Sequence, residues 1–141
     1  MTAVAFNPKT LAPAWNTFQR ALPVRLAAIH TQANYERAVE FMNQLLDVVG
    51  DDEEHELAEM LELLGQLIED YESQHYALPN TEPGQVLRFL IEQHHLKQVD
   101  LVAELGTQSV VSEILSGRRQ INARQAKALA QRFGVSAAVF I

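Results

Sequence analysis

The stretch GTQSVVSEILSGRRQIN, from Gly106 to Asn122, ends shortly after two adjacent arginines, Arg118 and Arg119. The chain of 141 residues has a formal net charge of −7, so this basic pair runs against the overall charge. A solvated turn needs only a glycine or one polar residue. Two adjacent arginines therefore indicate a polyanion as the partner, because the guanidinium fork bonds phosphate oxygens in pairs.

The residues on either side of Gly106 predict a helix-turn-helix. The first helix of the pair is KQVDLVAELG, Lys97 to Gly106, and the glycine permits a sharp backbone turn at the helix C-terminus. Thr107 is the expected N-cap of the second helix. That helix buries three residues at i, i+3 and i+4: Val111, Ile114 and Leu115.

The outer face of the second helix keeps short polar side chains that suit a major groove, because they have little bulk and can bond base edges. We predict base contacts for Gln108, Ser109, Ser112 and Glu113, and phosphate contacts for Arg118 and Arg119. Glu113 leaves two interpretations open. It can accept a hydrogen bond from cytosine N4, or it can pair with one of the two arginines without touching a base.

The net charge is divided unevenly along the chain. Residues 1–78 contain four basic and thirteen acidic residues, a net charge of −9. Residues 79–141 contain seven basic and five acidic residues, a net charge of +2. The acidic pI of the whole chain therefore does not exclude nucleic acid, and the two halves are expected to meet different partners.

The acidic half predicts two long helices joined by a tight connection. The first has apolar residues at three- and four-residue spacing from Tyr35 to Val49, with Thr31 or Asn34 as its N-cap. The residues 50–52, Gly-Asp-Asp, are expected to end it and to cap the second, which runs to Tyr71 with an acidic first turn at residues 53–56. We expect an antiparallel hairpin with an acidic outer face.

The remaining segments also favour helix. Prolines interrupt residues 1–30, where we expect one helix around Ala14–Leu22, and a linker with the domain boundary near Leu78 follows the hairpin. Beyond it lie five short helical patterns: Pro83–His95, Gln98–Leu105, Gln108–Leu115, Ala123–Phe133 and Ser136–Phe140. No segment has the period of two that a strand requires, so the fold class is all-α.

These motifs resemble two known families. LKQVDLVAELG followed by SVVSEILSGRRQIN is similar to the Xre/Cro family of lambda-repressor-like DNA-binding domains, over nearly all of residues 84–141. The upstream segment TQANYERAVEFMNQLLDVVGDDEEHELAEMLELLGQLIEDYESQHY resembles the helical hairpin of HigA-type antitoxins, with Tyr35, Tyr71 and Glu72 as landmarks. The resemblance covers residues 31–141 and implies an acidic helical hairpin followed by a five-helix DNA-binding domain. With the boundary near Leu78, we expect a helical toxin-binding or interaction domain over residues 1–78 and the DNA-binding domain over residues 79–141. The resemblance also implies a phosphate contact for Gln98.

The HigA resemblance implies two partners. One is a small basic ribonuclease toxin of the HigB type, which such antitoxins neutralise and which an acidic hairpin would attract. The other is double-stranded DNA with a palindromic operator, bound by a homodimer that represses its own operon. A stand-alone repressor, whose hairpin serves dimerisation or ligand sensing, is the alternative. The dimer could form through the hairpin or through the C-terminal helices.

The sequence argues against an enzyme, a cofactor site and a membrane protein. The segment His55–Glu59 lacks the second histidine of a HExxH zinc site, and the adjacent His94 and His95 point about 100° apart on a helix. No cysteine is present, which excludes disulfides and fits a reducing compartment. No signal peptide pattern and no apolar run of about 18 residues occur, so we expect a cytoplasmic protein.

Overall fold

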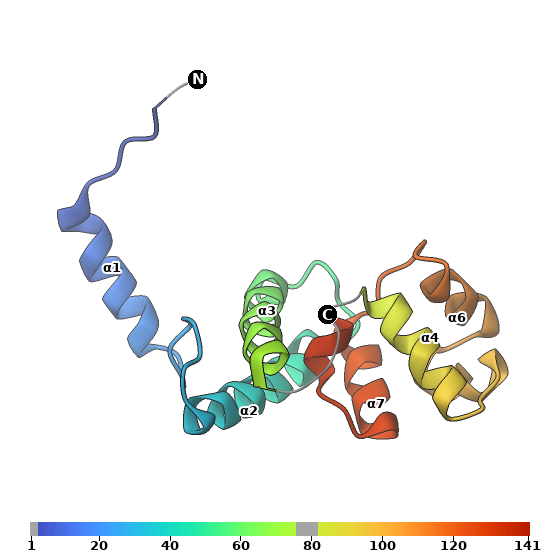
Figure 1. The fold of residues 1–141 in the computed structure, drawn as a ribbon. Helices are drawn as coiled ribbons and strands as arrows, with labels where there is room; N and C mark the ends of the chain where they lie inside the picture. Colours follow the sequence, from blue (N-terminus) through green and yellow to red (C-terminus); the bar gives the residue numbers. More distant parts are fainter. Residues whose placement is uncertain (1–2, 76–81) are drawn as a thin grey trace.

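The computed structural model of the chain describes residues 3–75 and 82–141, and within these ranges every regular element is helical (Figure 1). This confirms the all-α prediction. The elements in chain order are α1 (Pro8–Arg20), α2 (Gln32–Val49), α3 (Ala58–His75), α4 (Pro83–Gln93), the 3-10 helix η1 (Gln98–Leu101), α5 (Val102–Leu105), α6 (Gln108–Leu115), α7 (Ala123–Phe133) and the 3-10 helix η2 (Ala137–Phe140). Among the described residues, no helix is long and apolar enough to cross a membrane.

The helices α2 and α3 form the predicted antiparallel hairpin. Thr31 is the N-cap of α2, since its hydroxyl accepts the Asn34 N–H at 3.1 Å. The start of α2 lies beside the end of α3, where the Tyr35 hydroxyl donates to Glu72 Oε2 at 2.6 Å. The Tyr35 and Tyr71 rings stack with their centroids 4.8 Å apart.

The connection between α2 and α3 is longer than predicted. Helix α3 begins at Ala58, so the acidic residues 53–56 precede the helix instead of forming its first turn, and residues 50–52 do not cap it. Asp52 accepts the N–H of Glu54 at 3.0 Å, which uses its carboxylate within the connection. Asp51 is bonded to Arg124 and Asn122 of the C-terminal half. These contacts hold residues 50–57 as an irregular loop.

Helix α1 begins earlier than expected, at Pro8 instead of near Ala14, and ends at Arg20. Asn7 caps it by accepting the N–H of Lys9 at 3.0 Å, and Pro8 occupies the first turn, where its missing N–H has no consequence. Pro13 lies inside the helix. Because α1 is exposed along most of its length, the backbone carbonyl that loses its partner to Pro13 can bond water.

The C-terminal half follows the five helical patterns with two differences. Helix α4 ends at Gln93, and His95 adopts a positive φ of 53°, so the expected extension to His95 is wrong. The expected helix Gln98–Leu105 opens as the 3-10 turn η1 before it becomes α5. Lys97 at the N-cap supplies no side-chain acceptor, and Asp100 instead accepts the Lys97 N–H at 2.8 Å, which tightens this first turn.

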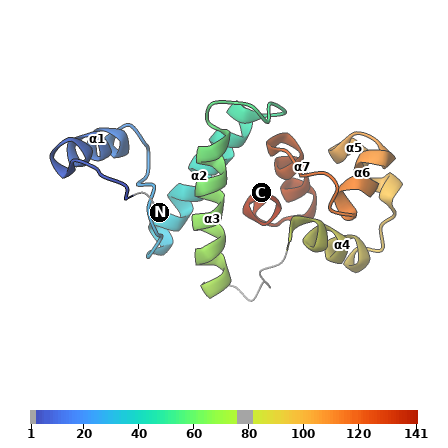
Figure 2. The same ribbon diagram turned by 90° about the horizontal axis from the view of Figure 1, so that it is seen from above.

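One hydrophobic core connects the hairpin with the C-terminal half. It includes Met42 of α2, Ile68 of α3, Leu87 of α4 and Leu129 of α7, together with Phe140 of η2, and each is at most 1% exposed. Helix α2 contacts α7 and α3 contacts η2, as Figures 1 and 2 show. The expected boundary near Leu78 lies outside the described residues.

Candidate nucleic-acid interface

The turn between α5 and α6 has the geometry of a helix-turn-helix. Gly106 has φ +112°, a conformation that L side chains rarely adopt, and its N–H closes α5 by bonding the Val102 carbonyl at 2.8 Å. Thr107 caps α6, since its hydroxyl accepts the Val110 N–H at 3.2 Å. Val111 and Ile114 are buried beneath α6, while Leu115 is half-buried and packs against the core. These features agree with the prediction from the sequence and fix which face of α6 is exposed.

That exposed face presents the residues expected to contact bases. Gln108, Ser109 and Ser112 are exposed, and Glu113 is half-buried. Successive positions three and four residues apart share one side of a helix, so Ser109, Ser112 and Glu113 lie together. The structure places these side chains on one surface, and their contacts with bases stay a prediction.

The two arginines follow a helix end that is closed by backbone hydrogen bonds. The Arg118 N–H donates to the Glu113 carbonyl at 2.9 Å and the Gly117 N–H donates to the Ile114 carbonyl at 3.1 Å, a Schellman motif with Gly117 at φ +80°. Both arginine side chains are exposed beside α6. Arg118 Nε also donates to the Ser116 hydroxyl at 3.1 Å. The backbone that presents the arginines is therefore fixed.

Glu113 pairs with Arg119 across the end of α6. Arg119 Nε lies 2.6 Å from Glu113 Oε2, and the two side chains are 49% and 38% exposed. This contact corresponds to the second of the two interpretations of Glu113, in which it neutralises an arginine. In this arrangement Arg119 reaches a phosphate only by leaving or sharing that carboxylate.

Three of the other six basic residues of the C-terminal half are also paired with carboxylates. Arg132 bonds Glu104 at 2.7 Å, Arg124 bonds Asp51 at 2.7 Å, and Lys127 pairs with Asp47 of α2. The hairpin therefore neutralises two cations of the positively charged half. Among the described basic residues of the C-terminal half, three form no ion pair with a carboxylate: Arg88, Lys97 and Arg118.

Two of these three cations were missed by the sequence reasoning. Arg88 of α4 donates to the Leu115 carbonyl at 3.3 Å, so it lies at the C-terminal end of α6 although 27 residues separate the two. Lys97 adjoins Gln98, which is half-buried at the start of η1. A single basic residue has no local sequence signal for DNA contact, and the position of Arg88 depends on how α4 packs against α6.

Helix α7 fastens α5 and α6 to the rest of the molecule. Gln125, which is 6% exposed, donates through Nε2 to the Leu105 carbonyl at 3.0 Å. Its Oε1 accepts the Asn122 N–H at 2.9 Å while Asn122 Oδ1 accepts the Gln125 N–H at 2.8 Å, a reciprocal cap of α7. One glutamine thus ties the end of α5 to the start of α7, and α7 in turn contacts α2 of the hairpin.

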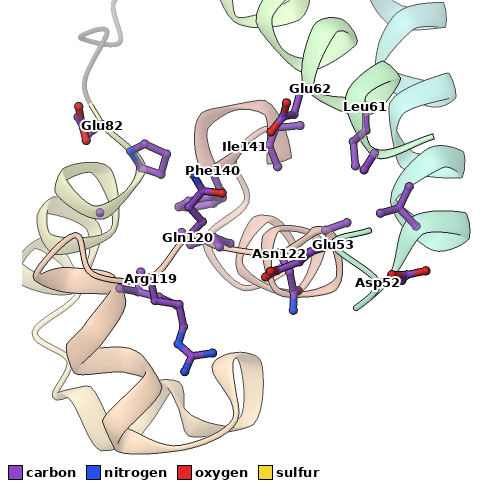
Figure 3. A pocket seen from close by; sticks show the side chains of 18 of the residues that line it. Asp52, Glu53, Leu61, Glu62, Glu82, Arg119, Gln120, Asn122, Phe140 and Ile141 are labelled. Atoms are coloured by element: carbon purple, nitrogen blue, oxygen red, sulfur yellow. The ribbon is translucent and has the colours of Figure 1, made fainter. Parts of the chain in front are cut away.

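A cavity of about 350 Å³ separates the loop after α6 from the α2–α3 connection (Figure 3). Its lining includes four carboxylates: Asp52, Glu53, Glu62 and Glu82. Such a lining repels phosphate. Arg119 also borders the cavity, but its guanidinium is directed toward Glu113 on α6. The cavity is therefore not where we expect a phosphate, and the phosphate contacts of Arg118 and Arg119 stay a prediction for the α6 side of this loop.

The far end of the hairpin contains a buried carboxyl group. Glu72 is 5% exposed, and burial raises its pKa against the opposing effect of the hydrogen bond from the Tyr35 hydroxyl. The Tyr71 ring stacks on His75 with centroids 3.9 Å apart, and the Tyr71 hydroxyl donates to Gln32 at 3.1 Å. This cluster closes the hairpin end farthest from the α2–α3 connection.

A short α5, a glycine turn and an exposed polar α6 followed by arginines define a helix-turn-helix protein, and residues 87–140 match the sequence model of the helix-turn-helix family. Residues 9–80 match the model described as HigA antitoxin, N-terminal domain. The chain belongs to the HigA antitoxin family, with a C-terminal Xre-type helix-turn-helix domain, which confirms both resemblances.

Relatives named Antitoxin HigA are similar over most of the chain. Those of Escherichia coli (strain K12) and Shigella flexneri are each 36% identical over 124 residues. The match covers 82% of this chain and 85% of each relative. The similarity therefore extends beyond the helix-turn-helix into the hairpin.

Proposed function

We propose that this protein is the antitoxin of a type II toxin–antitoxin module, which neutralises a HigB-type mRNA-cleaving ribonuclease and represses its own operon. The family model over residues 9–80 and the Antitoxin HigA relatives support the antitoxin role. Together with the absence of catalytic motifs in the sequence, they favour a binding protein over an enzyme. The observation that carries the DNA-binding role is the polar outer face of α6, followed by Arg118 and Arg119.

On DNA, α6 enters the major groove and the surrounding cations hold the backbone. Gln108, Ser109 and Ser112 contact base edges, while Gln98, Arg118 and Arg119 bond phosphates. Glu113 holds Arg119 when no phosphate competes for it, and is released or reads cytosine when DNA binds. Because one such helix reads few base pairs, a homodimer on a palindromic operator supplies the specificity. Arg88, at the C-terminal end of α6, and Lys97, next to Gln98, add further phosphate contacts.

The toxin binds the hairpin. Residues 35–75 contain thirteen acidic residues and one basic residue, a net charge of −12, which steers a small basic protein toward this surface. This part of the chain also carries its family resemblance outside the DNA-binding domain. Two partners of opposite charge thus meet two surfaces of opposite charge on one molecule.

Salt dependence of DNA binding tests the phosphate contacts. Each phosphate contact contributes about 0.9 to the slope of log affinity against log salt, so R118A/R119A should lower that slope by up to about 1.8 per protomer and weaken binding to all sequences. R25A/R37A removes the same charge outside the interface and should leave the slope nearly unchanged. An equal slope in R118A/R119A and the parent protein contradicts the assignment.

Sequence preference and toxin capture test the other two roles. Replacing Gln108 or Ser109 with alanine should change the motif recovered in a binding-site selection, and an unchanged motif contradicts the base contacts.

For the toxin, the full chain is purified with the product of an adjacent small basic reading frame. A stable complex that suppresses mRNA cleavage supports the antitoxin role, whereas no complex favours a stand-alone repressor.

A further inference from the structure

The first turn of α7 is bonded to the α2–α3 connection of the hairpin. Asp51 Oδ1 accepts hydrogen bonds from Arg124 Nε at 2.7 Å and from Asn122 Nδ2 at 3.0 Å. The carbonyl of the preceding residue, Gly50, accepts the Arg124 N–H at 3.1 Å. Two consecutive residues of the hairpin thus hold both the backbone and the side chain of one residue of α7.

A second contact lies further along α7. Lys127 pairs with Asp47 of α2, three positions after Arg124. Contacts at two points along a helix resist its rotation as well as its translation. We call the four charged residues of these two pairs the clasp: Asp47, Asp51, Arg124 and Lys127.

Apolar packing is interrupted beside the clasp. The cavity of about 350 Å³ in Figure 3 lies between the α2–α3 connection and the loop that joins α6 to α7. Its lining includes Gly50 and Asn122, which adjoin the clasp in space. Where side chains leave a hollow between two elements, van der Waals contact does not fix their relative orientation. On this side of the junction, the polar contacts of the clasp therefore fix it.

The junction is tightly packed where the C-terminus meets α3. Gly65 of α3 lies so close to Ile141 that a Cβ atom at Gly65 would be 2.6 Å from Ile141 Cδ1. Phe140, the neighbouring residue, is 1% exposed. This contact is the pivot of the junction, and the clasp prevents the DNA-binding half from tilting about it.

The clasp has little effect on stability and reduces the positive charge of the DNA-binding half. Asp51 and Arg124 are 61% and 46% exposed, and exposed ion pairs contribute little to the free energy of unfolding. Pairing with the hairpin also neutralises two cations that would otherwise attract phosphate. Orientation is the property that these contacts improve.

We propose that Asp47 and Asp51 are positioning residues for DNA recognition, which fix α6 relative to the hairpin and thereby set the half-site spacing that the protein accepts. This role rests on the homodimer of the proposed function, with the two copies joined outside their DNA-binding halves. One inserted base pair moves a half-site by about 3.4 Å and rotates it by roughly 35° about the DNA axis. A rigidly held α6 does not follow that movement, whereas a loosened one does.

Distances between two spin labels test the positioning itself, because the chain contains no native cysteine. N43C on α2 and Q108C on α6 place the labels at exposed positions of the two halves. An excess of unlabelled chain keeps the measured distance within one copy. D47A/D51A should broaden the distance distribution relative to the parent. An equally narrow distribution in this variant overturns the proposal.

Spacing preference tests the consequence for DNA binding. The parent chain first selects its duplex from a random pool, and affinity is then measured for that duplex and for a version with one base pair inserted between the half-sites. D47A/D51A should lower the ratio of these affinities by about 2-fold to 30-fold, the range expected for two exposed ion pairs. The ratio is insensitive to the two released cations, since they strengthen binding to both duplexes.

E40A/E54A is the matched control, because it removes two negative charges from exposed positions of the hairpin outside the clasp. It should keep the spacing ratio and the label distances of the parent. A ratio that falls equally in E40A/E54A, or that stays at the parent value in D47A/D51A, contradicts the positioning role. A parent chain that selects no duplex instead refutes the proposed function.

Exchange of the two charges provides a rescue. D51R/R124D restores an ion pair and puts its carboxylate in the first turn of α7, where the helix dipole favours an anion. D51R alone should lower the spacing ratio, and D51R/R124D should return it toward the parent value. If the double variant stays as permissive as D51R, the proposal fails.

Discussion

Replacing Glu113 with alanine distinguishes its two roles by the sign of the effect on DNA affinity. The substitution removes the carboxylate that lies 2.6 Å from Arg119 Nε. Both side chains are more than one third exposed, so the pair contributes about 0.2 to 1 kcal/mol. If Arg119 must leave this pair to reach a phosphate, E113A should strengthen binding to any duplex by about 1.4-fold to 5-fold.

The base-reading role predicts the opposite result. A lost contact to cytosine N4 should weaken binding to the selected site by about 5-fold to 150-fold, which corresponds to roughly 1 to 3 kcal/mol, and should leave a scrambled duplex almost unaffected. The two roles therefore predict opposite changes in affinity for the selected site. They also differ on the scrambled duplex, where only the ion-pair role predicts a change in affinity.

Fluorescence anisotropy measures both affinities over a range of salt concentrations. E40A is the control, because it removes one negative charge from an exposed position of α2 far from α6 in the sequence. E113A should bind the scrambled duplex more tightly than E40A and show a steeper salt dependence, since Arg119 is then available throughout. Weaker binding of E113A to the scrambled duplex would refute the ion-pair reasoning.

Two further predictions concern the fold. Phe140→Ala should lower the free energy of unfolding by about 3 to 5 kcal/mol, because the side chain is buried. Since η2 contacts α3, α4 and α7, calorimetry of this variant should still show one unfolding transition. Two separate transitions would contradict a shared core. The pKa of Glu72 is raised above its usual 4.5, so its contribution to stability is present below pH 4.5 and is lost as the pH rises through the folded-state pKa. Denaturant titrations should therefore show a smaller loss of stability toward neutral pH for Glu72→Gln than for the parent or for the exposed-site control Glu40→Gln. Equal losses would exclude this carboxyl as the cause.

Local sequence patterns predicted those features that neighbouring residues control. The apolar spacing of α2, α3 and α6 identified their buried faces, and Gly106 and Gly117 marked the two turns around α6 correctly. Helix periodicity and the need for a positive φ are properties of a few consecutive residues. A single sequence therefore contains the information for them.

Predictions at the helix ends were less successful, because distant groups compete for the capping residues. Asp51 was expected to help end α2 and cap α3, but it bonds Arg124 and Asn122, more than 70 positions away. Pro13 was expected to delay α1, but solvent exposure of that helix makes its missing hydrogen bond tolerable. Neither outcome depends on local propensity alone.

The sequence determined the class of fold, the helix-turn-helix and the family, since these depend on the identity and spacing of residues close together in the chain. Tertiary packing determined which cations remain unpaired. Arg124 and Lys127 are neutralised by the hairpin, while Arg88 is brought to the end of α6. Packing also left Trp15 and Phe18 of α1 exposed. Charge pairing and surface exposure depend on which residues the fold brings close together. The order of residues along the chain does not give these distances.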